Sequence, residues 1–164
     1  MSAIFSKSCE YGIQAVLYLA KNSTDGAPVQ LRSISGALKI PHYFLSKVLQ
    51  TLSRDEIVVS HKGLHGGFAL GRHPSRITLM DVAVAIDGKA FLDRCVLGYS
   101  KCSEESSCPA HRDWEPAKTL ILKMMQNKSF YDMSEAVNPA LDRLDAVARM
   151  NFQTHTATLP QSKA

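Results

Sequence analysis

Residues 40–70 have the sequence IPHYFLSKVLQTLSRDEIVVSHKGLHGGFAL, in which a helical pattern passes directly into a hairpin pattern. Apolar residues recur every three or four positions over 41–53, and proline suits the first turn of a helix. We expect the inward face of this helix to consist of Phe44, Leu45, Val48, Leu49 and Leu52. A β-branched stretch at 57–60, a glycine-rich turn at 63–67 and an apolar stretch at 68–70 predict a two-stranded β-hairpin.

The residues upstream supply the other half of a helix-turn-helix. A short helix is expected over Leu31–Leu38, and Pro41 stops it shortly afterwards. A longer helix is expected over 8–22, where a turn at Asp25-Gly26 follows. Two short helices joined by a tight turn and followed by a hairpin form a winged helix. The predicted fold class is therefore mainly α, a winged helix-turn-helix with a two-stranded β wing.

Two further helices are expected beyond the hairpin. Thr78 caps the first, Asp81 completes a capping-box pairing, and the helix stops at Asp87-Gly88. The second spans about 109–127. Its apolar stripe consists of Trp114, Ala117, Leu120, Ile121 and Met124. This stripe packs either against a partner chain or against its own domain, and the pattern alone leaves both open.

Length and composition place the chain among ordinary globular proteins. It has 164 residues, of which 45% are apolar and 21% charged, enough for one domain with an appended helix. No apolar run approaches the roughly 18–20 residues that a membrane span needs, and the N-terminal segment lacks the apolar core of a signal peptide. We therefore expect a cytoplasmic protein with no membrane contact, whose four cysteines are reduced and serve as ligands or reactive thiols.

The net charge of +4 is unevenly distributed. Residues 1–80 hold nine Lys and Arg against four Asp and Glu, whereas residues 81–164 hold ten against eleven. A basic N-terminal half beside a near-neutral C-terminal half suits a nucleic-acid-binding head on an oligomerisation or sensing part. Ordinary solvated surface gives the same imbalance, so the charge alone leaves both interpretations open.

The strongest local signal is the spacing Cys95-x6-Cys102-x5-Cys108-x2-His111. Thiolates select soft or borderline metals, which makes iron–sulfur and zinc the candidates. Zinc fingers use closer cysteine pairs, so these longer gaps favour a multi-iron centre. A thiol switch without metal, or three unligated cysteines in a loop, are the alternatives.

From residue 4 to about 137 the chain resembles the Rrf2 family of bacterial winged-helix regulators. The residues that carry the likeness lie at 10–15, 31–34, 40–52 and 62–68, together with the three cysteines, His111 and Trp114. The resemblance implies a homodimeric repressor or activator that binds a double-stranded DNA operator with an affinity set by an iron–sulfur cluster. A 2Fe–2S cluster is favoured and 4Fe–4S is possible, since three cysteines and one other ligand can hold either.

The resemblance also assigns ligands to this cluster. Cys95, Cys102 and Cys108 match the three cluster cysteines, although six residues separate the first two where IscR-like members have five. His111 matches the histidine that completes the cluster in IscR-like members. Glu10 lies where NsrR-like members supply a carboxylate from the other subunit. Both residues are therefore candidates for the fourth ligand, and His111 is favoured.

For DNA, the helix over 41–53 is expected to enter the major groove by its N-terminal end. The candidates for base or phosphate contacts on its first turns are His42, Tyr43, Ser46 and Lys47. IscR-like members have Glu and Gln in place of Ser46 and Lys47, so their operator sequence is not carried over. The remaining candidates are Lys62 and His65 at the wing tip, and Arg32, Lys39 and Arg54 as phosphate contacts that set the register.

The chain is expected to divide into four parts. These are a winged helix-turn-helix DNA-binding domain (1–88), a cysteine-rich cluster-binding loop (89–111), a dimerisation helix with a C-terminal helical segment (112–150) and a disordered tail (151–164). Further helical pieces are expected at 133–137 and 141–150. Cys9 matches no ligand and is expected to be a small buried side chain.

These features predict a dimeric transcription regulator whose cluster reports iron–sulfur status, nitric oxide or redox state. In the expected mechanism, cluster binding orders residues 95–111 and fixes the spacing of the two recognition helices, which changes the affinity for DNA half-sites. One alternative is a cluster-free regulator that responds to a small molecule or a partner protein; another is a thiol or zinc switch. An enzyme is not expected, because the sequence has no phosphate loop, nucleophile–base pair or GxGxxG pattern.

Overall fold

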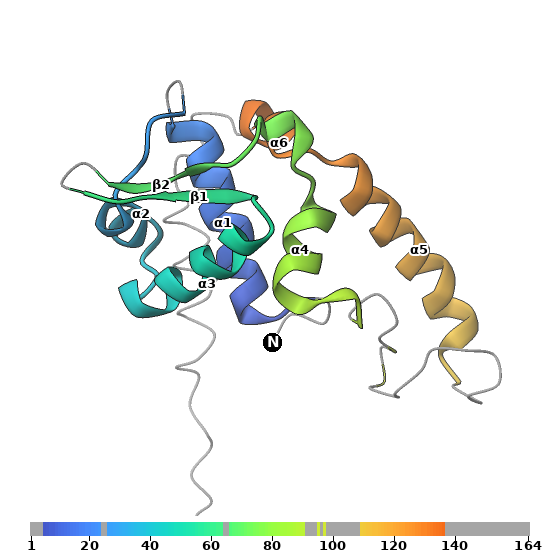
Figure 1. The fold of residues 1–164 in the computed structure, drawn as a ribbon. Coiled ribbons are helices and arrows are strands. Elements are labelled where there is room, and N and C mark those ends of the chain that lie inside the picture. Colours follow the sequence, from blue (N-terminus) through green and yellow to red (C-terminus); the bar gives the residue numbers. More distant parts are fainter. Residues whose placement is uncertain are drawn as a thin grey trace, which may run out of the picture.

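A computed structural model describes residues 5–23, 26–63, 66–90, 95, 97 and 109–136. Its elements, in chain order, are α1 (Lys7–Asn22), α2 (Leu31–Leu38), α3 (His42–Arg54), β1 (Val58–His61), β2 (Gly67–Leu70), the short 3-10 helix η2 (Pro74–Arg76), α4 (Leu79–Asp87), α5 (His111–Asn127) and α6 (Phe130–Ala136). Figure 1 shows α1 near the centre, α2 and the hairpin on one side of it, and α4 and then α5 on the other. The predicted class, mainly α with a two-stranded wing, is confirmed.

The first three helices enclose the main core of the protein. Its fully buried side chains include Val16, Leu19, Ile34, Leu45, Leu49 and Leu52. The turn between α2 and α3 is tight because Lys39 adopts a left-handed conformation, with φ of 53°. The next residue, Ile40, is buried, and its carbonyl oxygen accepts a hydrogen bond from the Ser35 hydroxyl at 2.7 Å. The helix-turn-helix is therefore held by the core on both sides of the turn.

The predicted inward face of α3 is confirmed for Leu45, Val48, Leu49 and Leu52, which are buried. The prediction is wrong for Phe44, which is 56% exposed. At 3.6 residues per turn, Phe44 lies about 100° around the helix from Leu45, at the edge of the buried stripe. The first turn of α3 therefore presents this ring to solvent.

The wing is an antiparallel pair in which Val58 faces Leu70 and His61 faces Gly67. It is fastened to the domain by a bridge between Val29 and Phe68, whose backbone N–H groups each donate to the carbonyl of the other at 2.8 and 2.9 Å. A side chain at Gly67 would overlap the Val29 carbonyl oxygen. The glycine therefore allows β2 to approach the chain that leads into α2.

Both ends of α4 are fixed by side chains. The predicted capping box is confirmed: the Asp81 N–H donates to the Thr78 hydroxyl at 3.2 Å, and the Thr78 N–H donates to the Asp81 carboxylate at 2.8 Å. At the other end, the Asp87 carboxylate accepts hydrogen bonds from the N–H and the hydroxyl of Ser6, the N-cap of α1. The start of α1 and the end of α4 are thereby joined.

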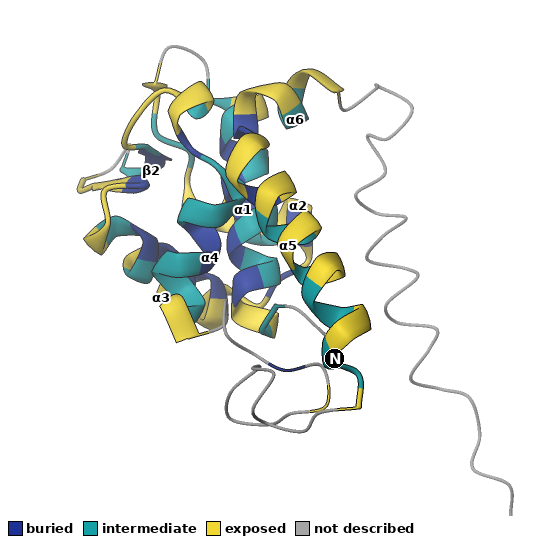
Figure 2. Ribbon diagram, turned by 90° about the vertical axis from the view of Figure 1, so that its right-hand side faces the viewer, coloured by how far each residue is buried: buried dark blue, intermediate teal, exposed yellow. Residues whose placement is uncertain are grey.

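The long helix α5 begins at His111, two residues later than expected, and packs along α4. Met125 is fully buried with Cys9 and Ala83, and Ile121 and Leu122 pack around them. Figure 2 views the molecule from this side and shows many exposed residues along α5. Only part of the predicted apolar stripe is therefore covered by the chain's own domain.

The last described helix, α6, returns to the main core through Phe130, which is fully buried. Its backbone N–H donates to the Ile77 carbonyl at 2.9 Å. This helix starts at Phe130, three residues before the start of the helical segment expected at 133–137. The expectations for 141–150 and for the tail at 151–164 lie outside the described residues. Within the described part of the chain, no helix combines the length and apolar character that a membrane crossing requires.

Candidate nucleic-acid interface and cysteine-rich segment

The first two turns of α3 present polar, basic and aromatic side chains to solvent. Tyr43 is 64% exposed, and His42 and Lys47 are also exposed, whereas Ser46 is half-buried. The Lys47 ammonium lies 4.4 Å from the centre of the Tyr43 ring, a cation–π contact across one helical turn. The structure therefore brings together the four residues that the sequence predicted as DNA contacts on this helix.

The wing and the start of α3 lie on the same side of the molecule. Figure 1 shows the first turn of α3 and the outer end of the hairpin on the side opposite α5. Lys62, which follows β1, is exposed, whereas His65 lies outside the described residues. A helix end and a hairpin on one side match the shape of a groove-binding surface.

The three predicted phosphate contacts differ in position. Arg32 on α2 and Lys39 in the turn before α3 are exposed and lie near the helix-turn-helix. Arg54 is also exposed but is the last residue of α3, about 18 Å along the helix axis from His42. The structure therefore does not bring Arg54 to the beginning of α3.

Of the predicted cluster ligands in the cysteine-rich segment, the structure describes Cys95 and His111. Cys95 is 6% exposed, and His111 is the half-buried first residue of α5. Cys102 and Cys108 lie outside the described residues. Among the described residues, no three His, Cys, Asp or Glu side chains converge on a common metal position.

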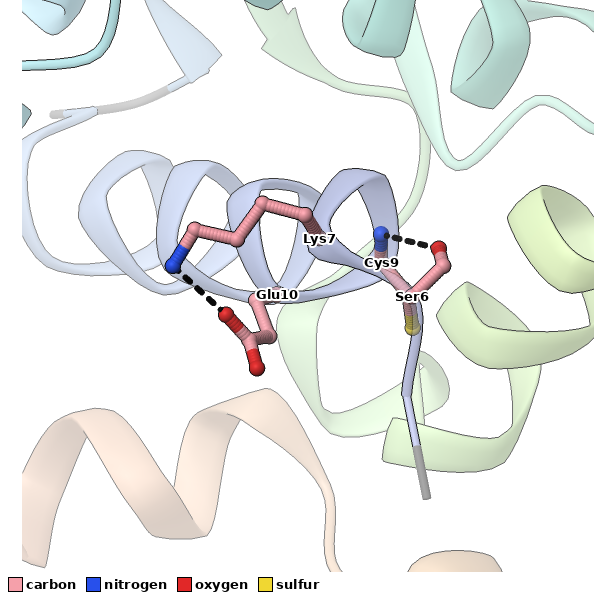
Figure 3. Close-up of polar contacts among 4 residues, drawn as sticks. All are labelled: Ser6, Lys7, Cys9 and Glu10. Carbon is pink, nitrogen blue, oxygen red and sulfur yellow. Dashed lines mark hydrogen bonds and ion pairs between the residues drawn. The ribbon is translucent and has the colours of Figure 1, made fainter. Parts of the chain in front are cut away.

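Glu10, the other candidate ligand, lies in the first turn of α1 and forms an ion pair within its own helix. Its carboxylate is 2.8 Å from the Lys7 ammonium, as Figure 3 shows. The hydrogen bond to Glu10 is the main reason that the pKa of Lys7 is raised above its usual value of 10.5. To bind a metal through Oε2, the Glu10 carboxylate would have to exchange this partner.

Cys9, next to Glu10, is fully buried between α1, α4 and α5, as the sequence predicted. Burial is the main cause that raises the pKa of its thiol to about 12, with smaller contributions from the carboxylates of Asp87 and Glu10. A neutral, enclosed thiol is a poor ligand and a poor nucleophile. Cys9 therefore belongs to the packing of the domain.

Sequence reasoning missed Phe44 as an exposed residue of the interface. The signal was present, because Phe44 falls outside the arc defined by Leu45, Leu49 and Leu52. The ring lies in edge-to-face contact with Tyr43, with centroids 5.9 Å apart and planes at 72°. The first turn of α3 thus carries two adjacent aromatic rings.

The helix-turn-helix, the antiparallel hairpin behind it and the exposed start of α3 define a winged-helix DNA-binding protein. The chain belongs to the Rrf2 family, because the model of that family, described as iron-dependent transcriptional regulator, matches residues 5–136. It is a family of transcriptional regulators, which makes a gene-regulatory role the established class for this chain.

Individual relatives agree with this assignment. A protein from Aquifex aeolicus named as an HTH-type transcriptional regulator is 35% identical over 79% of this chain and 90% of its own length. The transcriptional regulator IscR of Yersinia pseudotuberculosis is 31% identical over 88% of this chain and 84% of its own length.

Two solved structures share the fold. CymR, the global cysteine regulator of B. subtilis, has a TM-score of 0.69 at 22% identity and covers 82% of this chain and 98% of its own. IscR of T. potens has a TM-score of 0.58 at 24% identity and covers 96% of this chain and 92% of its own.

Proposed function

We propose that this protein is a homodimeric transcriptional regulator whose affinity for a DNA operator is controlled by an iron–sulfur cluster. The observation that carries the proposal is the donor set of Cys95, Cys102, Cys108 and His111 in the segment that joins α4 to α5 of an Rrf2-family winged helix. The cluster would report redox state, nitric oxide or iron–sulfur status. The kinship with IscR supports the same function.

The DNA contacts are assigned to the surface built by α3 and the wing. The start of α3 enters the major groove, where His42, Tyr43, Ser46 and Lys47 meet bases or phosphates. Lys62 and His65 reach the adjacent backbone or minor groove from the wing. Arg32 and Lys39 are placed to hold phosphates beside the helix, whereas Arg54 contacts DNA only if the duplex follows α3 to its end.

The contact with the second copy of the chain is assigned to α5. Ala117, Leu120 and Met124, here called the outer stripe, recur at spacings of three and four and are all exposed. Leu120 is 69% and Met124 44% exposed, although both are large and apolar. A symmetric pairing of two α5 helices would remove both stripes from water, which is the usual arrangement in homodimers.

The donor set fits an iron–sulfur cluster by its chemistry. Thiolates are the ligands that such clusters require, and the imidazole of His111 suits the fourth position. His111 is favoured over Glu10 because it lies three residues after Cys108 in the sequence, whereas Glu10 belongs to α1 and would have to come from the other copy. When bound, the cluster would supply a redox-active centre in a 2Fe–2S or 4Fe–4S form, with the former favoured.

The chain's own packing offers a route from this segment to the DNA surface. Ligands between Cys95 and His111 would fix the start of α5 relative to the end of α4. Val82 of α4 is fully buried in the main core, where Val48 of α3 also lies. A change at the α4–α5 junction would therefore shift the position of α3. In a dimer it would also change the distance between the two α3 helices.

The test is an iron and acid-labile sulfide assay, with an absorption spectrum, on protein purified without oxygen. We expect iron and sulfide in matching amounts and a visible spectrum that separates the two cluster types. Zinc without sulfide, or no metal, would overturn the cluster and leave the DNA-binding assignment in place. His111→Ala and Glu10→Ala, compared in the same assay, would identify the fourth ligand by the larger loss of iron.

A pocket favours a second candidate function, a cluster-free regulator that binds a small molecule. The pocket has a volume of about 600 Å³ between α1, η2 and α6, a size that suits a small ligand. Its lining includes Leu19, Leu70, Arg72, His73, Tyr131 and Glu135. A metabolite that raises the Tm of cluster-free protein and changes its operator affinity would support this function, provided that Tyr131→Ala removes both effects.

A further inference from the structure

The two aromatic rings at the start of α3 do not belong to the described hydrophobic clusters of their domain. Tyr43 is 64% and Phe44 56% exposed, and both lie outside the buried stripe of the helix. The other exposed large apolar side chains of α5 and α6 lie along the outer stripe or at the pocket. Adjacent exposed rings on the proposed DNA-binding helix therefore indicate contact with a partner that has apolar groups on its surface.

The local contacts hold the Tyr43 ring in place. Lys47 covers it from the next turn at 4.4 Å, and the edge-to-face contact with Phe44 fixes the angle between the two rings at 72°. A ring that is already oriented loses little freedom when it binds. Phe44 has no polar atom on its side chain, so it can gain affinity only from an apolar partner.

In the major groove of DNA, the apolar feature on the edge of a base pair is the 5-methyl group of thymine. The N-terminal turns of a recognition helix are the part that reaches base edges, and Phe44 lies in the first turn of α3. A phenyl ring placed there discriminates between bases by contact with this methyl group. The wedge-like insertion of apolar side chains between bases belongs to the minor groove and does not suit this position.

We propose that Phe44 reads a thymine in each operator half-site by packing on its 5-methyl group, with Tyr43 and Lys47 as the residues that position the ring. This inference rests on the proposed function, since it requires that α3 enters the major groove. It adds a defined feature of the DNA ligand, which is an A·T pair at one fixed position in each half-site. In a symmetric dimer the two thymines are related by the two-fold axis of the operator.

The test uses the full-length protein and operators selected from random duplex DNA. Each thymine of the selected operator is replaced by deoxyuridine, which removes only the methyl group, and affinity is measured by fluorescence anisotropy at one salt concentration. We expect one position in each half-site at which the replacement weakens binding by about fourfold, the value of one buried methyl-sized group. Phe44→Ala should weaken binding to the thymine operator and lose the sensitivity to deoxyuridine at that position.

The matched control is Gln126→Ala, which truncates an exposed side chain of α5 outside the pocket and the outer stripe and should leave the deoxyuridine profile unchanged. Because Phe44 is exposed, Phe44→Ala should melt at the same temperature as the parent protein, which separates loss of contact from loss of fold. Specific binding without thymine sensitivity, or with equal sensitivity in Phe44→Ala, would overturn the inference and leave the proposed function standing. Failure to bind any duplex sequence would overturn the proposed function itself.

Discussion

The helices α3 and α5 are both amphipathic, but among the described residues only α3 has its apolar stripe buried. α3 has 13 residues and buries four of them, whereas α5 has 17 and buries only Met125. The apolar stripe of α3 meets α1 and α2 in the main core. That of α5 is divided between an inner side against α4 and the exposed outer stripe. An amphipathic helix pattern alone therefore does not say how much of the apolar stripe the helix buries.

The same difference separates the two halves of the described chain. The N-terminal half forms most of the main core and the hairpin, and α6 completes that core with the fully buried Phe130. In the C-terminal half, the outer stripe of α5 is exposed among the described residues, and in the proposed dimer a second copy of the chain covers it. Variants in the two helices should therefore fail in different ways.

The largest effect is expected from Leu49→Ala in α3. Leu49 is fully buried in the main core, and a truncated core leucine costs about 2–5 kcal/mol of the free energy of unfolding. Chemical denaturation of the parent and the variant measures this loss. A cost below about 1 kcal/mol would contradict the description of the α3 stripe as a closed core.

A smaller loss is expected from Gly67→Ala at the base of the wing. The added Cβ would overlap the Val29 carbonyl oxygen, so the strand must shift, at a cost of about 1–3 kcal/mol. Gly36→Ala is the matched control, because open space surrounds that position on α2. The control should gain up to about 1 kcal/mol from helix propensity. Equal stabilities of the two variants would show that the wing does not need its close approach to Val29.

In α5, Leu120→Lys should leave the fold intact and weaken the proposed dimer. The side chain is 69% exposed, so the melting temperature of the monomer should be nearly unchanged. We expect the dimer dissociation constant, measured by analytical ultracentrifugation, to rise about tenfold or more. Gln126→Lys adds the same charge on the opposite side of α5 and should leave the constant unchanged. If Leu120→Lys dimerises like the parent, the outer stripe is not the interface.

The smallest effect is a pH dependence at Cys9, where α1, α4 and α5 meet. Burial raises the pKa of the thiol from 9.0 to about 12, so the folded state keeps its proton over a range where the unfolded state loses it. Stability is therefore fully present below pH 9 and falls as the pH rises above it. Urea unfolding at pH 8 and pH 10 should give a steeper loss in the parent than in Cys9→Ala. Parallel losses would mean that the thiol is hydrated in the folded protein.

The sequence predicted features that depend on residues three or four positions apart. The Thr78–Asp81 capping box, the buried residues Leu45 and Leu49, and the hairpin all follow from such local patterns. Phe44 was placed on the wrong side although it falls outside the arc of Leu45, Leu49 and Leu52, so a stricter use of the helical period would have predicted its exposure. The bridge between Val29 and Phe68 joins residues distant in sequence, and no local pattern predicts it.

For the candidate sites, the sequence predicted a set of residues but not how these residues are arranged in space. The four predicted contacts on α3 lie together, whereas Arg54 lies at the far end of the helix. The ion pair that holds Glu10 depends on Lys7 three residues earlier, and the sequence pattern did not single it out. The choice between His111 and Glu10 as the fourth ligand remains a prediction from the sequence.

The most direct test of control by a cluster is the operator affinity of the protein before and after removal of the proposed metal. Protein purified without oxygen is divided, one portion is stripped of iron with a chelator, and both are titrated onto the selected operator beside Cys102→Ala. We predict that the two parent samples differ in affinity by about tenfold or more, the range of ordinary coupling between two sites, and that Cys102→Ala behaves like stripped protein in both states. Equal affinities in all samples would contradict the control of DNA binding by a cluster.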